Sequence, residues 1–143
     1  MDTQQARHSV SVTGVITDDR GRALLIQRRD NHHWEPPGGI LELSESINDG
    51  LRREIREETG LEVEPVALTG VYKNMNRAII ALVFRCKTTG GQLQATDEAE
   101  GHHWATEAEI RELASEAYAI RVIDALHEHA PAAIRQHDGT QLL

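Results

Sequence analysis

The stretch that most constrains the fold of this 143-residue chain covers residues 38–61. Two prolines and two glycines at 36–39 predict a sharp turn, because proline fixes φ and glycine tolerates positive φ. A helix is expected next, over residues 46–59. Ser46 is a favourable N-cap for it, and Gly60 is typical of the left-handed residue that ends a helix. The sequence therefore predicts one well-defined helix directly after a tight turn.

This helix is expected to carry an acidic edge beside an apolar stripe. At about 100° per residue, the stripe consists of Ile47, Leu51 and Ile55. Three acids lie on its flank, namely Glu54, Glu57 and Glu58. Like charges held this close repel one another, so the arrangement is destabilising unless a cation neutralises it. Clustered hard oxygen ligands suit magnesium or manganese rather than zinc.

The same stretch resembles the Nudix box, the signature of the Nudix hydrolase family. The box reads Gly-x5-Glu-x7-Arg-Glu-U-x-Glu-Glu-x-Gly-U, where U is a bulky aliphatic residue. This chain fills every fixed position, in the order Gly39, Glu45, Arg53, Glu54, Ile55, Glu57, Glu58, Gly60 and Leu61. At average residue frequencies, the seven fixed Gly, Glu and Arg identities coincide by chance on the order of once in a hundred million starts. That rarity disfavours the alternative of an ordinary charged surface helix.

The resemblance implies the Nudix fold, an α/β/α sandwich with a mixed β-sheet. Apolar patterns elsewhere agree with a mixed α/β class, since they predict strands over 9–17, 23–28 and 77–86. A chain of 143 residues is long enough for one domain and too short for two of ordinary size. We therefore expect a single Nudix domain over residues 1–143, with its core at about 9–130 and a tail at 131–143.

The resemblance also implies the reaction. Nudix enzymes hydrolyse a nucleoside diphosphate linked to another moiety, by attack of water on phosphorus in the pyrophosphate. The reaction requires neutralised phosphate charge and a hydroxide nucleophile, and Mg²⁺ or Mn²⁺ supplies both. By match to the motif, the expected metal ligands are the Gly38 carbonyl, Glu54, Glu57 and Glu58.

Two further box residues have expected roles beside the metal. Glu45 is expected either to bind metal through water or to assist as a base. Arg53 is expected to orient the glutamates through hydrogen bonds rather than to contact substrate. The identity of the general base varies within the family, and Glu54 is our first choice among the glutamates.

Candidate residues outside the box lie in two places. Arg28 and Arg29 end a predicted strand, where they either contact substrate phosphate or are simply solvated. Nudix enzymes commonly add one acid from a distant loop, and the candidates here are Glu98 and Glu100. If residues 98–104 are extended, both acids share one face, and Glu100 lies nearer the ordered strand. We therefore expect Glu100, rather than Glu98, to join the site.

Composition indicates which binding partners and which cellular compartment to expect. A net charge of −8 disfavours nonspecific binding to nucleic acid or to an anionic membrane. The N-terminus has no apolar signal-peptide core, and the chain has no apolar run of about 18 residues. A single cysteine, Cys86, fits a reducing compartment. We expect a cytoplasmic protein without nucleic-acid or membrane partners.

The features outside the box leave the substrate open. The upstream motif of coenzyme A hydrolases is absent, and so are the downstream tyrosine of dinucleoside-polyphosphate hydrolases and the downstream proline of ADP-ribose enzymes. By elimination we expect a small MutT-like enzyme acting on a nucleoside triphosphate or a related nucleotide. The alternative is a catalytically silent Nudix module that binds a nucleotide as a sensor, but such modules usually lose box glutamates. Because many relatives are homodimers, we also expect a homodimer in which the neighbouring subunit is covered by Ile134, Leu142 and Leu143.

Overall fold

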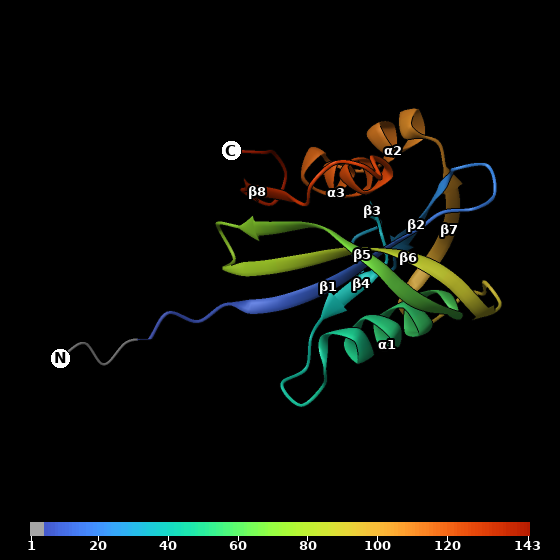
Figure 1. The fold of residues 1–143 in the computed structure, drawn as a ribbon, viewed down its shortest axis with the longest axis horizontal. Helices are drawn as coiled ribbons and strands as arrows, with labels where there is room; N and C mark the ends of the chain where they lie inside the picture. Colours follow the sequence, from blue (N-terminus) through green and yellow to red (C-terminus); the bar gives the residue numbers. More distant parts are fainter. Residues whose placement is uncertain (1–4) are drawn as a thin grey trace.

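The computed structural model describes residues 5–143 and has an α/β/α architecture (Figure 1). Its strands are β1 (Ser9–Ile16), β2 (Ala23–Arg28), β3 (Trp34–Glu35), β4 (Gly38–Ile40), β5 (Leu61–Asn74), β6 (Ile79–Gly91), β7 (Ala99–Ala105) and β8 (Ala133–His137). Its helices are α1 (Ile47–Thr59), α2 (Glu107–Leu113) and α3 (Glu116–Leu126). None of the helices that the structure describes has the length and apolarity needed to span a bilayer.

The strands form two sheets. The larger has five strands in the order β4-β1-β6-β5-β8, and the smaller has three in the order β3-β2-β7. In the larger sheet, β1 runs parallel to β6 and β5 runs parallel to β8, whereas β4–β1 and β5–β6 are antiparallel. Both pairs of the smaller sheet are antiparallel. This mixed arrangement confirms the predicted fold class.

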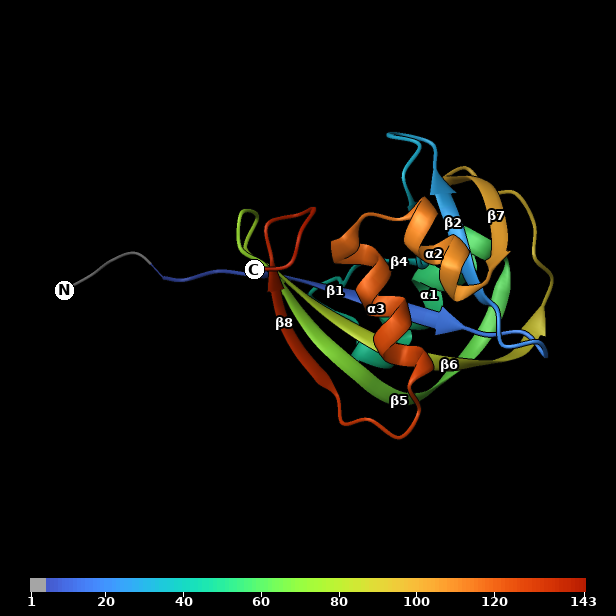
Figure 2. The same cartoon turned by 90° about the horizontal axis from the view of Figure 1, so that it is seen from above.

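Each face of the sheets has its own apolar core. In the view of Figure 2, α2 and α3 lie across the face opposite to α1. The core on the α2 and α3 side includes Val15, Leu25, Tyr72, Val83, Ile110 and Val122. The core on the α1 side includes Val12, Leu24, Leu51, Ile55, Val63 and Cys86. Alternate residues of β1 and β2 thus point to opposite cores, as the two-residue period of a strand requires.

The helix of the box forms where the sequence predicted it. The Ser46 hydroxyl accepts a hydrogen bond from Asp49 N–H at 3.1 Å, and Gly60 ends the helix at φ 80°. Only glycine adopts that conformation without strain. Leu51 and Ile55 are fully buried. Ile47 is 43% exposed, so the predicted stripe is wrong at this position, because the chain enters the helix from an exposed turn.

The C-terminal residues extend the larger sheet. Residues 133–137, which we expected in a tail, form β8 and pair with β5 from Gly70 to Asn74. Asp124 of α3 joins these elements, because it accepts hydrogen bonds from the Tyr72 hydroxyl at 2.6 Å and from Arg135 at 2.7 and 2.8 Å. The packed structure therefore continues beyond residue 130, where we expected the core to end.

Candidate active site

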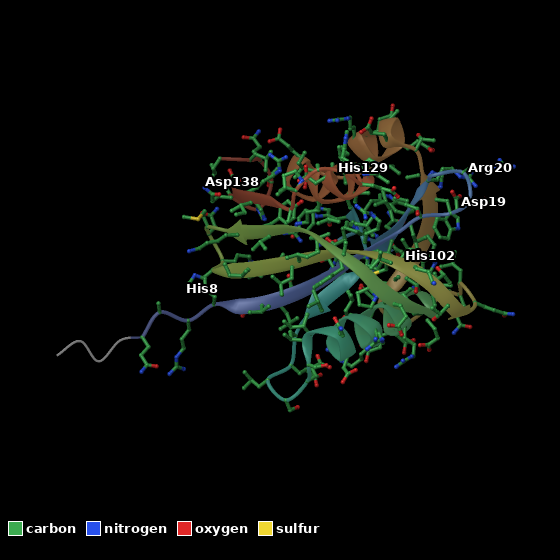
Figure 3. The ribbon with its side chains drawn as sticks, viewed as in Figure 1. His8, Asp19, Arg20, His102, His129 and Asp138 are labelled. Carbon is green, nitrogen blue, oxygen red and sulfur yellow. The ribbon has the colours of Figure 1, made fainter. Side chains whose placement is uncertain are left out.

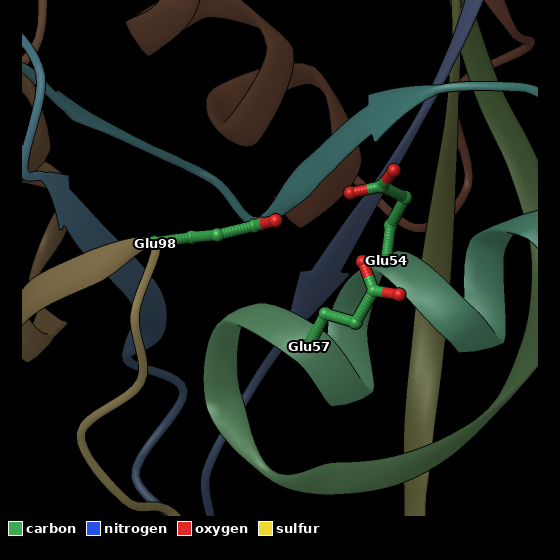
Figure 4. A group of neighbouring side chains, drawn as sticks. All are labelled: Glu54, Glu57 and Glu98. Atoms are coloured by element: carbon green, nitrogen blue, oxygen red, sulfur yellow. The ribbon is translucent and has the colours of Figure 1, made fainter.

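Three carboxylates from two distant parts of the chain meet beside the second half of α1 (Figure 4). Glu54 and Glu57 project from the helix, and Glu98 reaches them from the residue before β7. One carboxylate oxygen from each lies within 4.8 Å of the other two. These are the hard oxygen donors that a divalent cation such as magnesium or manganese prefers.

A fourth carboxylate, Glu58, lies deeper in the protein. Its residue is 3% exposed, and one of its oxygens accepts a hydrogen bond from Gly38 N–H at 2.6 Å. Burial is the main reason that the pKa of Glu58 is raised from an ordinary 4.5 to about 8, and repulsion by Glu54 adds to it. Burial also raises the pKa of Glu54. Both pKa shifts indicate that the ionised carboxylates receive less stabilisation from the protein alone than they would receive from water.

Arg53 holds the box carboxylates in place. Its guanidinium donates to Glu45 at 2.9 and 2.5 Å, to Glu54 at 2.9 Å and to Glu57 at 3.3 Å. It also donates to the Ile40 carbonyl at 3.3 Å. The side chain therefore joins α1 to the preceding turn, in the orienting position that the motif implied.

Glu45 has a different environment from the other box acids. Besides the bonds from Arg53, its carboxylate accepts a hydrogen bond from Glu42 N–H at 2.9 Å. Hydrogen bonding by Arg53 is the largest cause that lowers the pKa of Glu45 to about 2. A carboxylate with so low a pKa is a poor proton acceptor at neutral pH. The geometry therefore favours a positioning role for Glu45 over a role as a base, which was one of the two roles expected for it.

The glycine turn allows the backbone to approach the acids closely. A Cβ atom on Gly39 would lie 2.3 Å from an oxygen of Glu54, and one on Gly38 would lie 2.3 Å from the Val12 carbonyl oxygen. Real Cβ atoms do not tolerate such contacts, so any other residue would displace the carboxylate or the strand. The turn thus places main-chain atoms directly beside the candidate metal ligands.

Arg28 and Arg29 line the same cleft as the acids. The cleft has a volume of about 390 Å³, and its walls also include Gly38, Glu54, Glu58 and Glu98. Arg28 is paired with Asp30 at 2.7 Å and with Glu35 at 3.1 Å. Arg29 donates to the Thr96 carbonyl at 3.0 Å and forms no ion pair within the described part of the chain. Arg29 therefore keeps N–H groups available to a phosphate. Glu35 is a partly buried acid that the sequence reasoning missed.

The main chain at the end of α1 is tied to β7. The imidazole of His102, labelled in Figure 3, lies with Nε2 2.9 Å from the Glu58 carbonyl oxygen. Carbonyls in the last turn of a helix have no partner within the helix, so a donor from a neighbouring strand stabilises them. This contact places the start of β7, and with it Glu98, next to the helix.

Our expectation that Glu100 rather than Glu98 joins the acids is not met by the structure. Gln27 pairs with Gly101 whereas Arg28 pairs with Ala99, so Glu100 is an extra residue in a β-bulge. The bulge breaks the alternation that the prediction assumed over 98–104. Glu100 instead contacts the exposed His32, and Glu98 reaches the cluster.

The comparisons with known proteins agree with this geometry. The family model for the NUDIX domain matches residues 7–126. The chain belongs to the Nudix family. It is 50% identical over 141 residues to a MutT-like protein of Streptomyces ambofaciens, covering 99% of this chain and 91% of that protein.

Other relatives are more distant. The chain is 37% identical over 99 residues to an ADP-ribose pyrophosphatase of Methanocaldococcus jannaschii, covering 64% of this chain and 58% of that protein. A solved ADP-ribose pyrophosphatase of Streptococcus suis aligns with a TM-score of 0.77 at 20% identity, over 90% of this chain and 99% of its own, which shows the shared fold. The family match and these relatives identify this Nudix protein as a pyrophosphohydrolase.

The first prediction concerns the stability of the metal-free Nudix hydrolase. Because the folded pKa of Glu58 is about 8 and its ordinary value is 4.5, the folded state binds the extra proton between these values. Stability from this group is therefore present at low pH and is lost as pH rises through 8. Glu58→Gln should remove that loss, on the order of 2–4 kcal/mol, since one pKa unit corresponds to about 1.4 kcal/mol. Urea unfolding with a chelator at pH 5.5 and 8.5, as approximate end points of this window, measures it.

The exposed neighbour provides the control for this comparison. Glu57→Gln removes the same charge from a residue that is not buried, so its loss of stability with pH should follow the unmodified protein. Equal slopes for the unmodified protein and Glu58→Gln would show that Glu58 is ionised at neutral pH, against the prediction.

The second prediction separates the two loop acids. Glu98→Gln should weaken Mn²⁺ binding and lower turnover by at least about tenfold, because it removes one of the clustered charges. Glu100→Gln, two residues away in the bulge, should change both by less than about twofold. Calorimetric titration measures the Mn²⁺ affinity of both variants, and steady-state kinetics measure their turnover. A larger effect from Glu100→Gln would contradict the placement of the loop.

Proposed function

We propose that this Nudix hydrolase uses Mg²⁺ or Mn²⁺ to hydrolyse the pyrophosphate linkage of a nucleoside triphosphate or a related nucleotide. The observation that carries the proposal is the meeting of Glu54, Glu57 and Glu98 beside a cleft. Two of these acids line that cleft together with Glu58 and two arginines. A silent nucleotide sensor would have no need to retain this destabilising set of carboxylates.

The donor set supports a hard divalent cation. Glu54, Glu57, Glu58 and the Gly38 carbonyl are the proposed ligands, and Glu98 is the proposed additional one. When bound, the cation neutralises phosphate charge and lowers the pKa of a bound water. The raised pKa of Glu58 fits this assignment, because a buried acid that the protein compensates poorly is one that a cation would stabilise in its ionised form.

The remaining roles follow from the hydrogen bonds. Arg53 donates to one oxygen of Glu54, and the other oxygen has no hydrogen-bond donor within residues 5–143. We therefore retain Glu54 as the proposed general base, held in position by Arg53. Arg29 is the proposed phosphate contact, because Arg28 is already bound by Asp30 and Glu35. Arg28 would then act mainly by orienting the rim of the cleft.

The substrate proposal rests on similarity to known proteins. The MutT-like relative covers nearly the whole chain, which favours a small nucleotide over a larger conjugate. Two other relatives are named for different substrates, ADP-ribose and 8-oxo-dGDP. A panel of nucleotides is therefore the direct test.

The third prediction is that nucleoside triphosphates are hydrolysed only when a divalent cation is present. Chelation should abolish turnover, and Mg²⁺ or Mn²⁺ should restore it. Glu57→Gln should lower it by about a hundredfold, because it removes a ligand charge. Separate measurement of phosphate and pyrophosphate, over a panel that includes ADP-ribose, identifies the bond that is cut.

A charge-matched variant controls for nonspecific effects. Glu62→Gln removes an exposed carboxylate that pairs with Arg56 on the outer side of α1. Its turnover should stay within about twofold of the unmodified enzyme. Turnover that survives chelation, or a panel in which no nucleotide is cut, would refute the proposal.

We also propose that the enzyme forms a homodimer through β8, which is an edge strand of the larger sheet. Ile134 in this strand is 83% exposed and Leu143 is also exposed, and buried apolar area stabilises an interface. Leu142, by contrast, is held within its own subunit, because its N–H donates to Glu116 at 2.7 Å. Light scattering should give the mass of two chains, and Ile134→Lys should give the mass of one. A single-chain mass for the unmodified protein at micromolar concentration would reject the dimer.

A further inference from the structure

Arg121 is a buried cation on the side of the sheets opposite to the carboxylate cluster. It belongs to α3 and is 6% exposed. Its guanidinium carbon lies 4.6 Å from the centre of the Tyr118 ring and 5.5 Å from that of the Tyr72 ring. Both distances are within the range of a cation–π interaction, which stabilises the charge but satisfies no N–H group.

The hydrogen bonds of Arg121 are incomplete. Its Nε is buried and has no hydrogen-bond partner among the described residues. Its Nη2 lies 3.1 Å from Nε2 of His137, but Nδ1 of the same ring accepts from Gly139 N–H at 2.9 Å. Burial lowers the pKa of His137, which favours the neutral ring, and a neutral imidazole has only one acceptor nitrogen. His137 therefore cannot accept both bonds.

The charge of Arg121 also lacks a direct counterion. Within residues 5–143, no carboxylate forms an ion pair with it. Burial lowers the pKa of Arg121, yet an arginine side chain stays protonated in a protein. A buried charge without a carboxylate partner is destabilising, so a purely structural role would be better served by an apolar side chain.

A cavity of about 260 Å³ lies against Arg121. It shares Arg28, Gly38, Gly39 and Ile40 with the carboxylate-lined cleft, so one ligand can extend through both. Several of the other groups on its walls are donors, namely Ser11, Thr13, Arg77 and Arg121. The acid among the lining residues, Glu35, is already paired with Arg28. The cavity therefore favours a ligand group that accepts hydrogen bonds.

The other walls indicate the shape of that group. Ile40, Ile79 and Tyr118 give the cavity apolar and aromatic surfaces, which a small inorganic anion does not need. A planar base matches both kinds of wall, since its faces are apolar and its edge is polar. Paired acceptors on the edge of an oxo-purine suit the fork of a guanidinium, whereas an exocyclic amino group would place donor against donor.

We propose that Arg121 is a specificity residue that reads the carbonyl edge of the substrate base and selects oxo-purine over amino-purine nucleotides. The inference rests on the proposed function for the chemistry of the substrate, but its binding test does not require hydrolysis. Arg121 contacts the base rather than the reacting phosphates, which lie on the other side of Gly38 and Gly39.

The binding test uses inosine and adenosine, which are uncharged and differ at the six-position of the base. In the metal-free protein, titration with inosine should shift the NMR signal of the Arg121 Nε–H group, and adenosine should bind about tenfold more weakly without that shift. A merely structural arginine would not respond. Equal affinities, or an unmoved Nε–H signal with bound inosine, would overturn the proposal.

Variants of Arg121 test the same point. Arg121→Met should abolish the preference for inosine and should be at least as stable to heat, because it removes an unpaired buried cation. Arg121→Lys keeps the charge but loses the planar fork, so it should lose most of the preference as well. If Arg121→Lys still prefers inosine to adenosine, the assignment is overturned. This variant alone decides the point if Arg121→Met fails to fold.

A second cation at the cavity provides the control. Arg77 is exposed at the cavity wall, and Arg77→Met should weaken inosine and adenosine binding by the same factor. Kinetics with inosine and adenosine triphosphates separate the two proposals. Hydrolysis at equal kcat/KM would overturn the role of Arg121 and leave the proposed function standing. If neither triphosphate is hydrolysed but the protein keeps an Arg121-dependent preference for inosine, the proposed function is overturned and the role of Arg121 stands.

Discussion

The hydrogen bond from Gly38 N–H to the buried carboxylate of Glu58 joins the two halves of the active site. It connects α1 to β4, and β4 in turn pairs with β1 in the larger sheet. The position of the helix is thereby set against a strand that carries part of the cleft wall. Because the donor is a main-chain amide next to a second glycine, the strand can approach Glu54 as closely as it does. The geometry of the site depends on this contact more than on any surface ion pair, since exposed pairs contribute little.

The same contact shows how stability and activity oppose each other in this protein. Glu58 is held in a place where burial and Glu54 disfavour its ionised form. Arg53 offsets part of the repulsion among the neighbouring carboxylates, and it does so from one side only. A fold optimised for stability would replace Glu58 with an apolar residue. The retained acid is therefore explained by the cation that it is proposed to bind, and functional sites commonly carry such destabilising groups.

Much of the fold and part of the site are predictable from the sequence, because their signals are local. The turn at Gly38, the cap at Ser46 and the end of α1 at Gly60 follow from neighbouring residues, and the spacing of Glu54, Glu57 and Glu58 places them on one helix. Glu98 was ranked below Glu100 because a β-bulge arises from pairing between strands and leaves no trace in the spacing along one strand. β8 was not expected because five residues that include an arginine, a glutamine and a histidine give only a weak strand signal, and the pairing with β5 identifies the strand.

Arg121 illustrates a further limit of sequence reasoning, because an arginine in a short amphipathic helix is normally solvated. Its burial depends on the Tyr72 ring from the distant β5 as well as on Tyr118 one turn earlier in the same helix, so it becomes visible only in three dimensions. The structure then shows opposite charge imbalances on the two sides of Gly38–Ile40, with acids toward α1 and an unpaired cation toward α3. Without a metal, a phosphate would be repelled from the acids and drawn to the arginine side. A bound divalent cation reverses that preference, because it converts the acidic side into the stronger site for phosphate. The metal would thus determine which end of the nucleotide faces the carboxylates, and only that orientation brings the pyrophosphate to the proposed base and the base edge to Arg121.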